Sequence, residues 1–224
     1  MSMRCFDKMT CPIEKKYAIV IPARKGSKGI PYKNRKLIEY TLEVIPDRLK
    51  NNITIATDDD FIIDKYNDYD IFKRSDKVSM DHSSTKSLFL EMKNHIKFPN
   101  IIMLYLTYPE RSLQHILNAV EFYEKNKATS LLCSKKPKTS PFLMMYKDGT
   151  NGRQIIKHNL YRRQDYPICF EISHFISIFK KKEVDNLNNN MYNKDTIFFP
   201  VDDFIDIDTN RDLESFNEKN KNNR

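Results

Sequence analysis

The sequence predicts a single α/β domain with a mostly parallel sheet and helices on both faces of that sheet. The main observation is that short apolar runs rich in β-forming residues alternate with helix-like segments from Tyr17 to Cys133. The 224 residues are also enough to build one sizeable core. A third observation is that the alternation breaks after Cys133, which indicates a small lobe added to the domain.

The first half of the chain consists of expected βα units. A buried strand is expected at 17–21, and Pro22 ends it. The apolar residues between Leu37 and Ile45 have near-helical spacing, and Pro46 stops that helix. By the same criteria we expect further strands at 52–57, 70–74, 100–106 and 129–133, and further helices at 60–67, 83–93 and 112–125.

The second half is less regular. Residues 135–166 hold two prolines, short β-like pieces and many cations, which favours an extension or hairpin lobe. Strands are expected at 170–179 and 196–201, and the acidic segment 202–208 leads into a last helix capped at Thr209. We therefore expect a loose lead-in over 1–15, a domain over 16–216 with 135–168 as an inserted lobe, and a frayed tail over 217–224.

Charge and cysteine content limit the class of partner and the compartment. Lys and Arg outnumber Asp and Glu by 38 to 30, and this net charge of +8 suits anionic ligands, nucleic acid or an anionic membrane surface equally well. Four cysteines without Cys-x-x-Cys pairs favour reduced thiols. Since no apolar run reaches signal-peptide or membrane-spanning length, we expect a cytoplasmic protein without a membrane partner.

A basic loop follows the first expected strand. It contains two glycines, Gly26 and Gly29, among the cations Arg24, Lys25, Lys28, Lys33, Arg35 and Lys36. Glycines allow backbone N–H groups to approach phosphate oxygens, and fixed cations neutralise those oxygens. The loop has neither the Walker pattern nor the dinucleotide Gly-x-Gly-x-x-Gly. The sequence therefore favours a polyphosphate site here, with a solvated basic turn as the alternative.

An acidic pair near the other end of the chain is the second informative feature. Asp206 and Asp208 are two residues apart, a spacing that puts both carboxylates on one face of a strand. Mg²⁺ is commonly held by one or two carboxylates together with substrate phosphates. The alternative is an acidic helix N-terminus, which Asp stabilises in any case. Ligands bind beyond the carboxyl ends of the strands in open α/β sheets, so we expect this pair and the basic loop to share one crevice.

The residues of both segments resemble motifs of a known protein family. Ile21-Pro-Ala-Arg-Lys-Gly-Ser-Lys-Gly-Ile-Pro-Tyr-Lys-Asn34 closely resembles the signature loop of the cytidylyltransferases that make CMP-sialic acid and related CMP-nonulosonates, and Ile205-Asp-Ile-Asp-Thr209 resembles a second segment of that family. The resemblance implies a Rossmann-like nucleotidyltransferase fold and catalytic roles for Arg24, Lys33, Asp206 and Asp208. It also implies that Asp206 and Asp208 bind Mg²⁺ and that CTP is held by Arg24, Ser27, Lys28, Lys33 and Asn34.

Other matches to the family are partial. Asp81-His-Ser-Ser-Thr85 makes Ser84 a candidate nucleotide contact, with a helix N-cap as the alternative. The remaining candidates are implied to bind the acceptor: Tyr105, Thr107, Arg111, Arg162, Arg163, Gln164 and Ser173. Two of these are departures, because Tyr105 stands where the family has Gln, and the stretch around Ser173 replaces Asn-Gly-Ala. The sequence therefore supports the use of CTP better than it supports the identity of the acceptor.

These observations lead to one hypothesis and two alternatives. The hypothesis is a cytidylyltransferase that joins CMP from CTP to the anomeric hydroxyl of a nonulosonic acid and releases pyrophosphate, with Mg²⁺ as cofactor. The resemblance also implies that the 135–166 lobe pairs two subunits into a homodimer. One alternative is a cytidylyltransferase for another acceptor, such as Kdo or a sugar phosphate. The other is a degenerate, non-enzymatic module that binds nucleotide or nucleic acid, although basic–aromatic interleaving is missing from the sequence.

Overall fold

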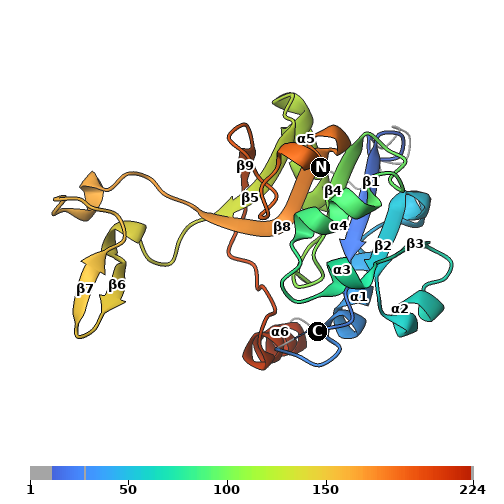
Figure 1. Ribbon diagram of the computed structural model, residues 1–224, viewed down its shortest axis with the longest axis horizontal. Helices are drawn as coiled ribbons and strands as arrows, with labels where there is room; N and C mark the ends of the chain where they lie inside the picture. The colour runs from blue at the N-terminus through green and yellow to red at the C-terminus, as the bar shows by residue number, and fades with distance from the viewer. Residues whose placement is uncertain (1–11, 28, 223–224) are drawn as a thin grey trace.

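The computed structural model describes residues 12–27 and 29–222, and it contains a seven-stranded sheet in the order β3-β2-β1-β4-β8-β5-β9 (Figure 1). Strand β8 is antiparallel to its neighbours β4 and β5, and the other adjacent pairs are parallel. The strands are β1 (Tyr17–Pro22), β2 (Ile53–Thr57), β3 (Asp70–Lys73), β4 (Asn100–Met103), β5 (Ser130–Lys135), β8 (Glu171–Lys180) and β9 (Ile197–Pro200). The predicted mostly parallel α/β sheet is confirmed.

Helices cover both faces of this sheet, as the sequence predicts. The α-helices are α1 (Lys33–Glu43), α2 (Asp60–Lys65), α3 (Asp76–Ser79), α4 (Thr85–Met92), α5 (Leu113–Lys125) and α6 (Asn210–Asn222), and the short 3-10 helices of the core are η2 (Asp47–Asn52) and η5 (Lys181–Asn186). Successive side chains of β1 point to opposite faces. Ile19 and Ile21 therefore join a core cluster with α1 and α5, whereas Ala18 and Val20 join a second cluster with α3 and α4.

Strand β4 is shorter than predicted. It ends at Met103, although the apolar run continues to Leu106. The amide of Leu104 still bonds to the carbonyl of Val20. Beyond that point side-chain contacts replace the ladder: the Tyr105 carbonyl accepts a hydrogen bond from Arg111, and the hydroxyls of Tyr105 and Thr85 bond to each other. The chain thus leaves the sheet at the position where it enters the candidate site.

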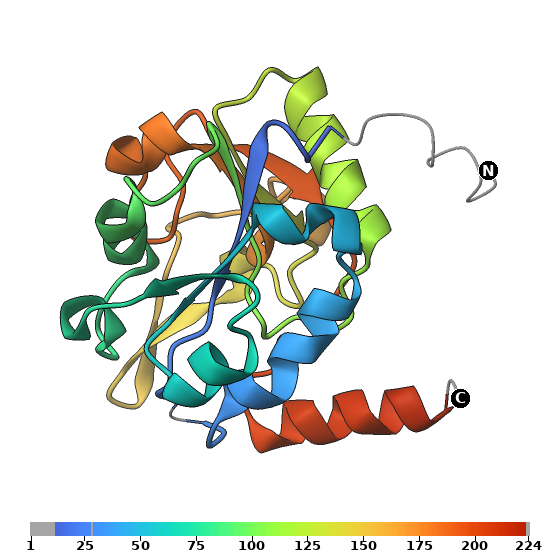
Figure 2. The ribbon, with the colours of Figure 1, turned by 90° about the vertical axis from the view of Figure 1, so that its right-hand side faces the viewer.

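The two ends of the described chain are packed more firmly than expected. Residues 1–11 of the lead-in lie outside the described residues, but Ile13 is fully buried and its carbonyl accepts the Tyr17 amide. The expected frayed tail is wrong for residues 217–222, which continue α6. Helix α6 lies against α1 (Figure 2), where the ring of Phe216 meets Tyr40 at 5.2 Å. A Lys219–Glu110 ion pair adds a second anchor.

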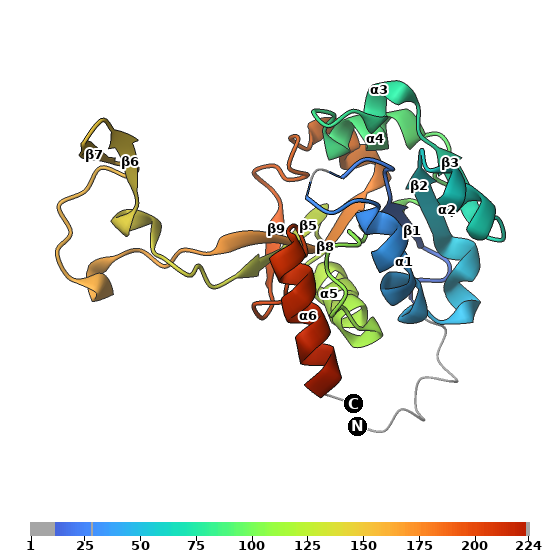
Figure 3. The same cartoon turned by 90° about the horizontal axis from the view of Figure 1, so that it is seen from below.

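The inserted lobe projects from the sheet as an arm, here defined as residues 136–170 (Figures 1 and 3). It carries the hairpin of β6 (Met145–Asp148) and β7 (Asn151–Gln154) and the short helices η3 (Pro141–Leu143) and η4 (Arg163–Asp165). Gly149 turns the hairpin with a φ of 61°, a conformation that favours glycine. The predicted hairpin lobe is confirmed. Of the helices in the described residues, none has the length and apolar character needed to cross a membrane.

Candidate active site

A cleft of about 240 Å³ opens at the carboxyl ends of β1 and β4. Its walls come from the basic loop after β1, from the segment before α4 and from the residues that follow β4. The residues that line it are Pro22, Arg24, Gly26, Ser27, Lys33, Asn34, Arg74, Asp81, Ser83, Ser84, Thr85, Leu88, Tyr105, Leu106 and Thr107. Seven of the predicted site residues are therefore brought together: Arg24, Ser27, Lys33, Asn34, Ser84, Tyr105 and Thr107.

The basic loop is held from behind by the end of β2. Thr57 donates its hydroxyl to the carbonyl of Ala23 at 2.6 Å, and Asp58 accepts the Lys25 amide at 2.7 Å. Asn34 closes the loop on itself, since its side-chain amide donates to the carbonyl of Arg24 at 2.8 Å. The loop is therefore pre-formed, which is what a phosphate-binding loop requires. Lys28, a predicted CTP contact, lies outside the described residues.

Gly29 brings this loop against the acidic segment. A Cβ atom added at Gly29 would overlap the carbonyl oxygen of Asp208, so only glycine fits this approach. The acidic segment is fixed to the end of β4 as well, because the Ile207 amide donates to the carbonyl of Thr107 at 2.8 Å. The acidic segment, Asp206 and Asp208 included, does not line the cleft itself, but it lies against Thr107, which does, and against the loop at Gly29.

Lys33 joins the basic loop to the acidic pair directly. Its ammonium group donates to the carboxylate of Asp208 at 2.9 Å and to the carbonyl of Ile207 at 3.0 Å. The expected strand at 206–208 is wrong: β9 ends at Pro200, and residues 201–208 form no strand, although the Val201 amide still bonds to the carbonyl of Ser134. The segment is instead an extended lead to α6, held by the Asp212 carboxylate, which accepts the amides of Asp208 and Thr209.

Two further charged side chains, Arg24 and Arg74, line the cleft. Arg24 forms an ion pair with Asp81 at 2.5 Å, so a predicted phosphate-binding cation is already held by a carboxylate. Arg74 was missed by sequence reasoning. Its side chain lines the cleft, donates to the carbonyl of Val78 and is buried with its Nε unpartnered among the described residues, and burial lowers its pKa. Only its position directly after β3 could have drawn attention to it.

Ser84 has both of the roles that the sequence left open. It is the N-cap of α4, where its hydroxyl accepts the Ser87 amide at 3.1 Å, and it also lines the cleft. A hydroxyl that caps a helix still has lone-pair and donor capacity for a ligand. The cap therefore fixes the position of a group that a nucleotide could meet.

A second group of side chains surrounds Asp206, beside Tyr105. The ring of His174 packs edge-on against Tyr105 at 5.6 Å, and its Nδ1 is buried without a partner among the described residues. Burial lowers the pKa of His174, and the nearby Asp206 opposes that shift. Burial raises the pKa of Tyr108, and Asp206 raises it further. These aromatic side chains form a half-buried wall next to an exposed carboxylate.

Arg111 and Ser173 lie beneath this wall rather than in the cleft. Arg111 is 2 % exposed, and its guanidinium donates to the carbonyls of Phe175 and Tyr105, each at 2.8 Å. Burial lowers the pKa of Arg111 to about 10. Ser173 is also buried and accepts the Phe175 amide at 3.3 Å. Both residues hold the backbone that carries Tyr105 and His174, and neither lines the cleft, so their predicted contact with an acceptor stays a prediction.

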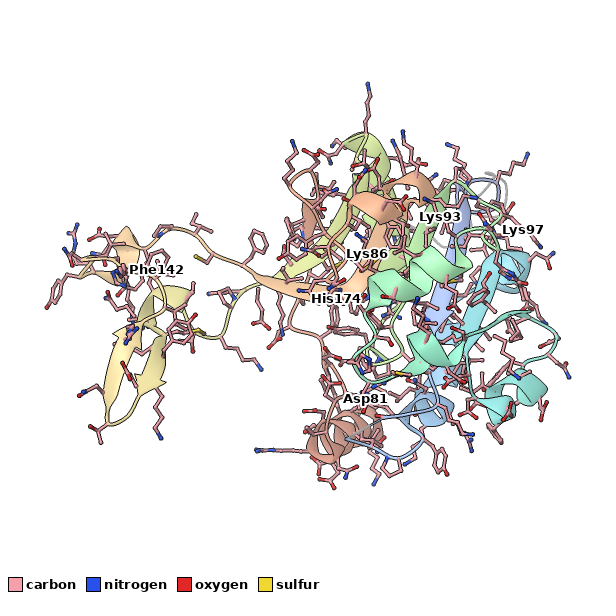
Figure 4. All side chains as sticks on the ribbon, in the orientation of Figure 1. Asp81, Lys86, Lys93, Lys97, Phe142 and His174 are labelled. Atoms are coloured by element: carbon pink, nitrogen blue, oxygen red, sulfur yellow. The ribbon has the colours of Figure 1, made fainter. Side chains whose placement is uncertain are left out.

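The remaining acceptor candidates, Arg162, Arg163 and Gln164, are not brought to this cleft. They lie on the arm, where Arg162 binds the Asp165 carboxylate through two bonds of 2.9 Å. Figure 4 shows the arm, marked by Phe142, well away from Asp81 and His174 on the core. Within one chain, these residues cannot act at the site that the other candidates form.

The donor set for a metal ion is small. Across residues 12–27 and 29–222, no three or more His, Cys, Asp or Glu side chains come together as a possible metal centre. Asp206 and Asp208 are two carboxylates, and Mg²⁺ ordinarily binds to one or two carboxylates plus substrate phosphates. The residues therefore fit Mg²⁺ if a nucleotide supplies further oxygens. Asp59 is no candidate, since its buried carboxylate is taken up by Arg35.

Comparison with known proteins gives the family context. A family model described as cytidylyltransferase matches residues 18–220. The flagellin modification protein B of Campylobacter coli is 28% identical, over 87% of this chain and 89% of that protein. The pseudaminic acid cytidylyltransferase of Campylobacter jejuni is 28% identical, over 51% of this chain and 56% of that protein. Among solved structures, a CMP:2-keto-3-deoxy-manno-octonic acid synthetase complexed with CTP has a TM-score of 0.66 at 14% identity, over 94% of this chain and 100% of that chain, which shows a shared fold.

Proposed function

The chain belongs to the cytidylyltransferase family, and from that premise we propose that it transfers CMP from CTP to the anomeric hydroxyl of a nonulosonic acid and releases pyrophosphate. The observation that carries the proposal is the contact between Lys33 and Asp208, which ties the acidic segment to a cation that lines the cleft. The acceptor class is supported by two relatives, which are named as cytidylyltransferases for pseudaminic acid and for N-acylneuraminate.

The nucleotide side of the cleft suits CTP. Arg24 and Lys33 provide two fixed positive charges for the triphosphate, and the pre-formed loop around Gly26 and Ser27 presents backbone amides. Arg74, Ser84 and Thr85 are among the other polar groups of the lining that could meet the nucleoside. Charge neutralisation by preorganised groups is the main source of catalysis in phosphoryl transfer. The cleft therefore supplies what nucleotidyl transfer needs on the donor side.

The wall of Tyr105 and His174 is the proposed acceptor site. From that side the acceptor's anomeric oxygen would attack the α-phosphorus, forming a new P–O bond while the bond to pyrophosphate breaks. The hydroxyl proton leaves the attacking oxygen, and Asp206 is the exposed carboxylate beside this wall that could receive it, directly or through water. Asp206 and Asp208 would also hold Mg²⁺, which neutralises charge on the phosphate oxygens. Lys33 orients Asp208 and keeps the loop closed on it.

The arm supports a homodimer. Its exposed apolar side chains include Leu143, Met145, Tyr146, Tyr161, Ile168 and Phe170. A hollow of about 780 Å³ at its base is lined by cations and apolar groups, among them Lys135, Arg163 and Phe170. We propose that two copies pair through this arm and that Arg162, Arg163 and Gln164 reach the partner's cleft. Light scattering that gives one chain per particle at assay concentration would refute this part. The cytoplasmic location stays a prediction.

The experiment that tests the function is pyrophosphate release from CTP with a panel of acceptors: N-acetylneuraminic, legionaminic and pseudaminic acids, Kdo and a sugar 1-phosphate. We expect turnover with a nonulosonic acid, and loss of that turnover in excess EDTA with recovery on added Mg²⁺. Turnover with Kdo or the sugar phosphate alone would instead favour a cytidylyltransferase for that acceptor. Salt-sensitive binding of random DNA without any turnover would instead favour a binding module.

A further inference from the structure

An ion pair behind the cleft takes no direct part in the proposed CMP transfer. The guanidinium of Arg35 meets the carboxylate of Asp59 through two hydrogen bonds of 2.7 Å each. Neither residue lines the cleft. The Asp59 side chain is only 2% exposed, and burying a carboxylate costs free energy unless the charge is paired. Burial opposes ionisation, but the bonds from Arg35 and from the Phe61 amide outweigh it and lower the pKa of Asp59.

Arg35 also holds a strained turn. Tyr32, directly before α1, has a φ of 55° and a ψ of 33°, the left-handed conformation that side chains other than glycine rarely adopt. The guanidinium of Arg35 lies 4.2 Å from the centre of the Tyr32 ring and 4.8 Å from that of Phe61. Arg35 thus clamps the Tyr32 ring while both of its bonded nitrogens reach Asp59.

The turn at Tyr32 determines where the next two residues point. Lys33 reaches Asp208 on one side, and Asn34 reaches the carbonyl of Arg24 on the other. Both contacts are made by the first turn of α1. If Tyr32 relaxed to an ordinary conformation, the start of α1 would swing and both contacts would be displaced together. The geometry of the cleft therefore depends on the clamp behind it.

Asp59 is itself fixed to the sheet. Its amide bonds to the hydroxyl of Thr57 at 3.0 Å, and that hydroxyl donates to the carbonyl of Ala23. Asp59 also caps α2 by accepting the Phe61 amide at 3.1 Å. Since β2 is fully buried, Asp59 provides a rigid point to which Arg35 is tied.

We infer that Arg35 and Asp59 are positioning residues that set Lys33 and Asn34 for binding the triphosphate of CTP, an inference that rests on the proposed function. In the sequence, Arg35 is one of the cations of the predicted polyphosphate loop. The structure separates these cations: Arg24 and Lys33 line the cleft, whereas Arg35 forms an ion pair with Asp59 behind it.

Conservative variants test the inference. Arg35→Lys keeps the positive charge but loses the planar fork and the ring stacking. Asp59→Asn keeps the shape and the helix cap, since Asn is also a good N-cap, but loses the charge. Lys36→Gln is the matched control, because Lys36 is an exposed cation one residue further along α1 and, unlike Arg24 and Lys33, does not line the cleft. Melting temperature and far-UV circular dichroism establish that each variant is folded.

The readout is CTP binding by calorimetry in Mg²⁺ buffer, together with KM for CTP and for the preferred acceptor. We expect each variant to weaken CTP binding about 10- to 100-fold, because small displacements at a site cost that much. We expect the double variant to be no worse than the worse single one, and KM for the acceptor to stay unchanged. The Lys36→Gln control should bind as the wild type does.

Two results would overturn the inference while leaving the function intact: normal CTP binding by folded Arg35→Lys, or losses that simply add in the double variant. A loss of affinity for both substrates in proportion to a lowered melting temperature would also overturn it, because it would indicate general destabilisation. A wild-type protein that binds no CTP would instead refute the proposed function, and this inference with it.

Discussion

The ammonium group of Lys33 lies 2.9 Å from the carboxylate of Asp208, although the two residues are 175 positions apart in the sequence. Lys33 begins α1, directly after the basic loop, and Asp208 precedes α6. The contact joins a cation suited to phosphate with one of the two carboxylates suited to Mg²⁺. The predictions below follow from this relationship and from the segments that hold it in place.

Gly29→Ala tests how closely the basic loop must approach the acidic segment. An added methyl group would overlap the carbonyl oxygen of Asp208, so one of the two segments has to move. We expect a loss of about 1 to 3 kcal/mol of stability, as for other overpacked sites, and a fall in kcat. Urea unfolding and steady-state kinetics measure both. Gly26→Ala is the control for stability, because a methyl group there meets nothing within 4 Å.

Asp81→Asn tests the ion pair across the cleft. In the structure Arg24 is already bonded to Asp81, and incoming phosphate has to compete with that carboxylate. Removing the negative charge should lower KM for CTP about two- to fivefold, the range for partly exposed pairs. Asp76→Asn, an exposed carboxylate in α3, is the control. A higher KM for CTP would show that Asp81 holds Arg24 in its productive position instead.

His174→Ala tests the acceptor wall. The half-buried His174 ring packs against Tyr105, and its Nδ1 has no partner within the described part of the chain, so its removal should change acceptor recognition while leaving the nucleotide side intact. We expect KM for the nonulosonic acid to rise about tenfold, as when a buried polar partner is lost, with KM for CTP unchanged. His82→Ala, an exposed histidine, is the control. An unchanged acceptor KM would remove His174 from the acceptor site.

Acid should weaken the clamp of Arg35 and Asp59. The pKa of Asp59 is lower in the folded protein than in the unfolded chain, where it is about 3.9. Its contribution to stability is therefore fully present above that value and is lost as the pH falls through the folded pKa. In urea unfolding, the stability difference between wild type and Asp59→Asn should be large at pH 7 and shrink below pH 4. A difference independent of pH would contradict the pairing.

The sequence predicted best those features that depend on the residues of a single segment. The alternation of strands and helices, the hairpin arm and the basic loop all depend on local patterns, and the structure has them at the expected places. Patterns could not show that Arg111 turns inward to hold the carbonyls of Tyr105 and Phe175, or that Arg35 turns away from the cleft. Those outcomes depend on which neighbours the fold supplies.

For the acidic segment, the local sequence pattern predicted the wrong secondary structure. Two aspartates at a spacing of two suggested a strand, yet residues 201–208 add no strand to the sheet. The bonds from Ile207 to Thr107 and from Lys33 to Asp208 place the segment instead, and both are long-range. Arg74 was overlooked because a single arginine after a strand has no distinctive sequence signal. Its burial beside the cleft becomes visible only in three dimensions.

The most direct test of the central claim is the rate of pyrophosphate release from CTP and the preferred nonulosonic acid, compared among wild type, Lys33→Met and Asp208→Asn, with Lys36→Met as control. Removing one preorganised charge from a transition state costs about 100- to 1,000-fold in rate, and we expect a loss of that size in both Lys33→Met and Asp208→Asn. The control should keep the wild-type rate. Folded Lys33→Met or Asp208→Asn protein with wild-type turnover would contradict the account.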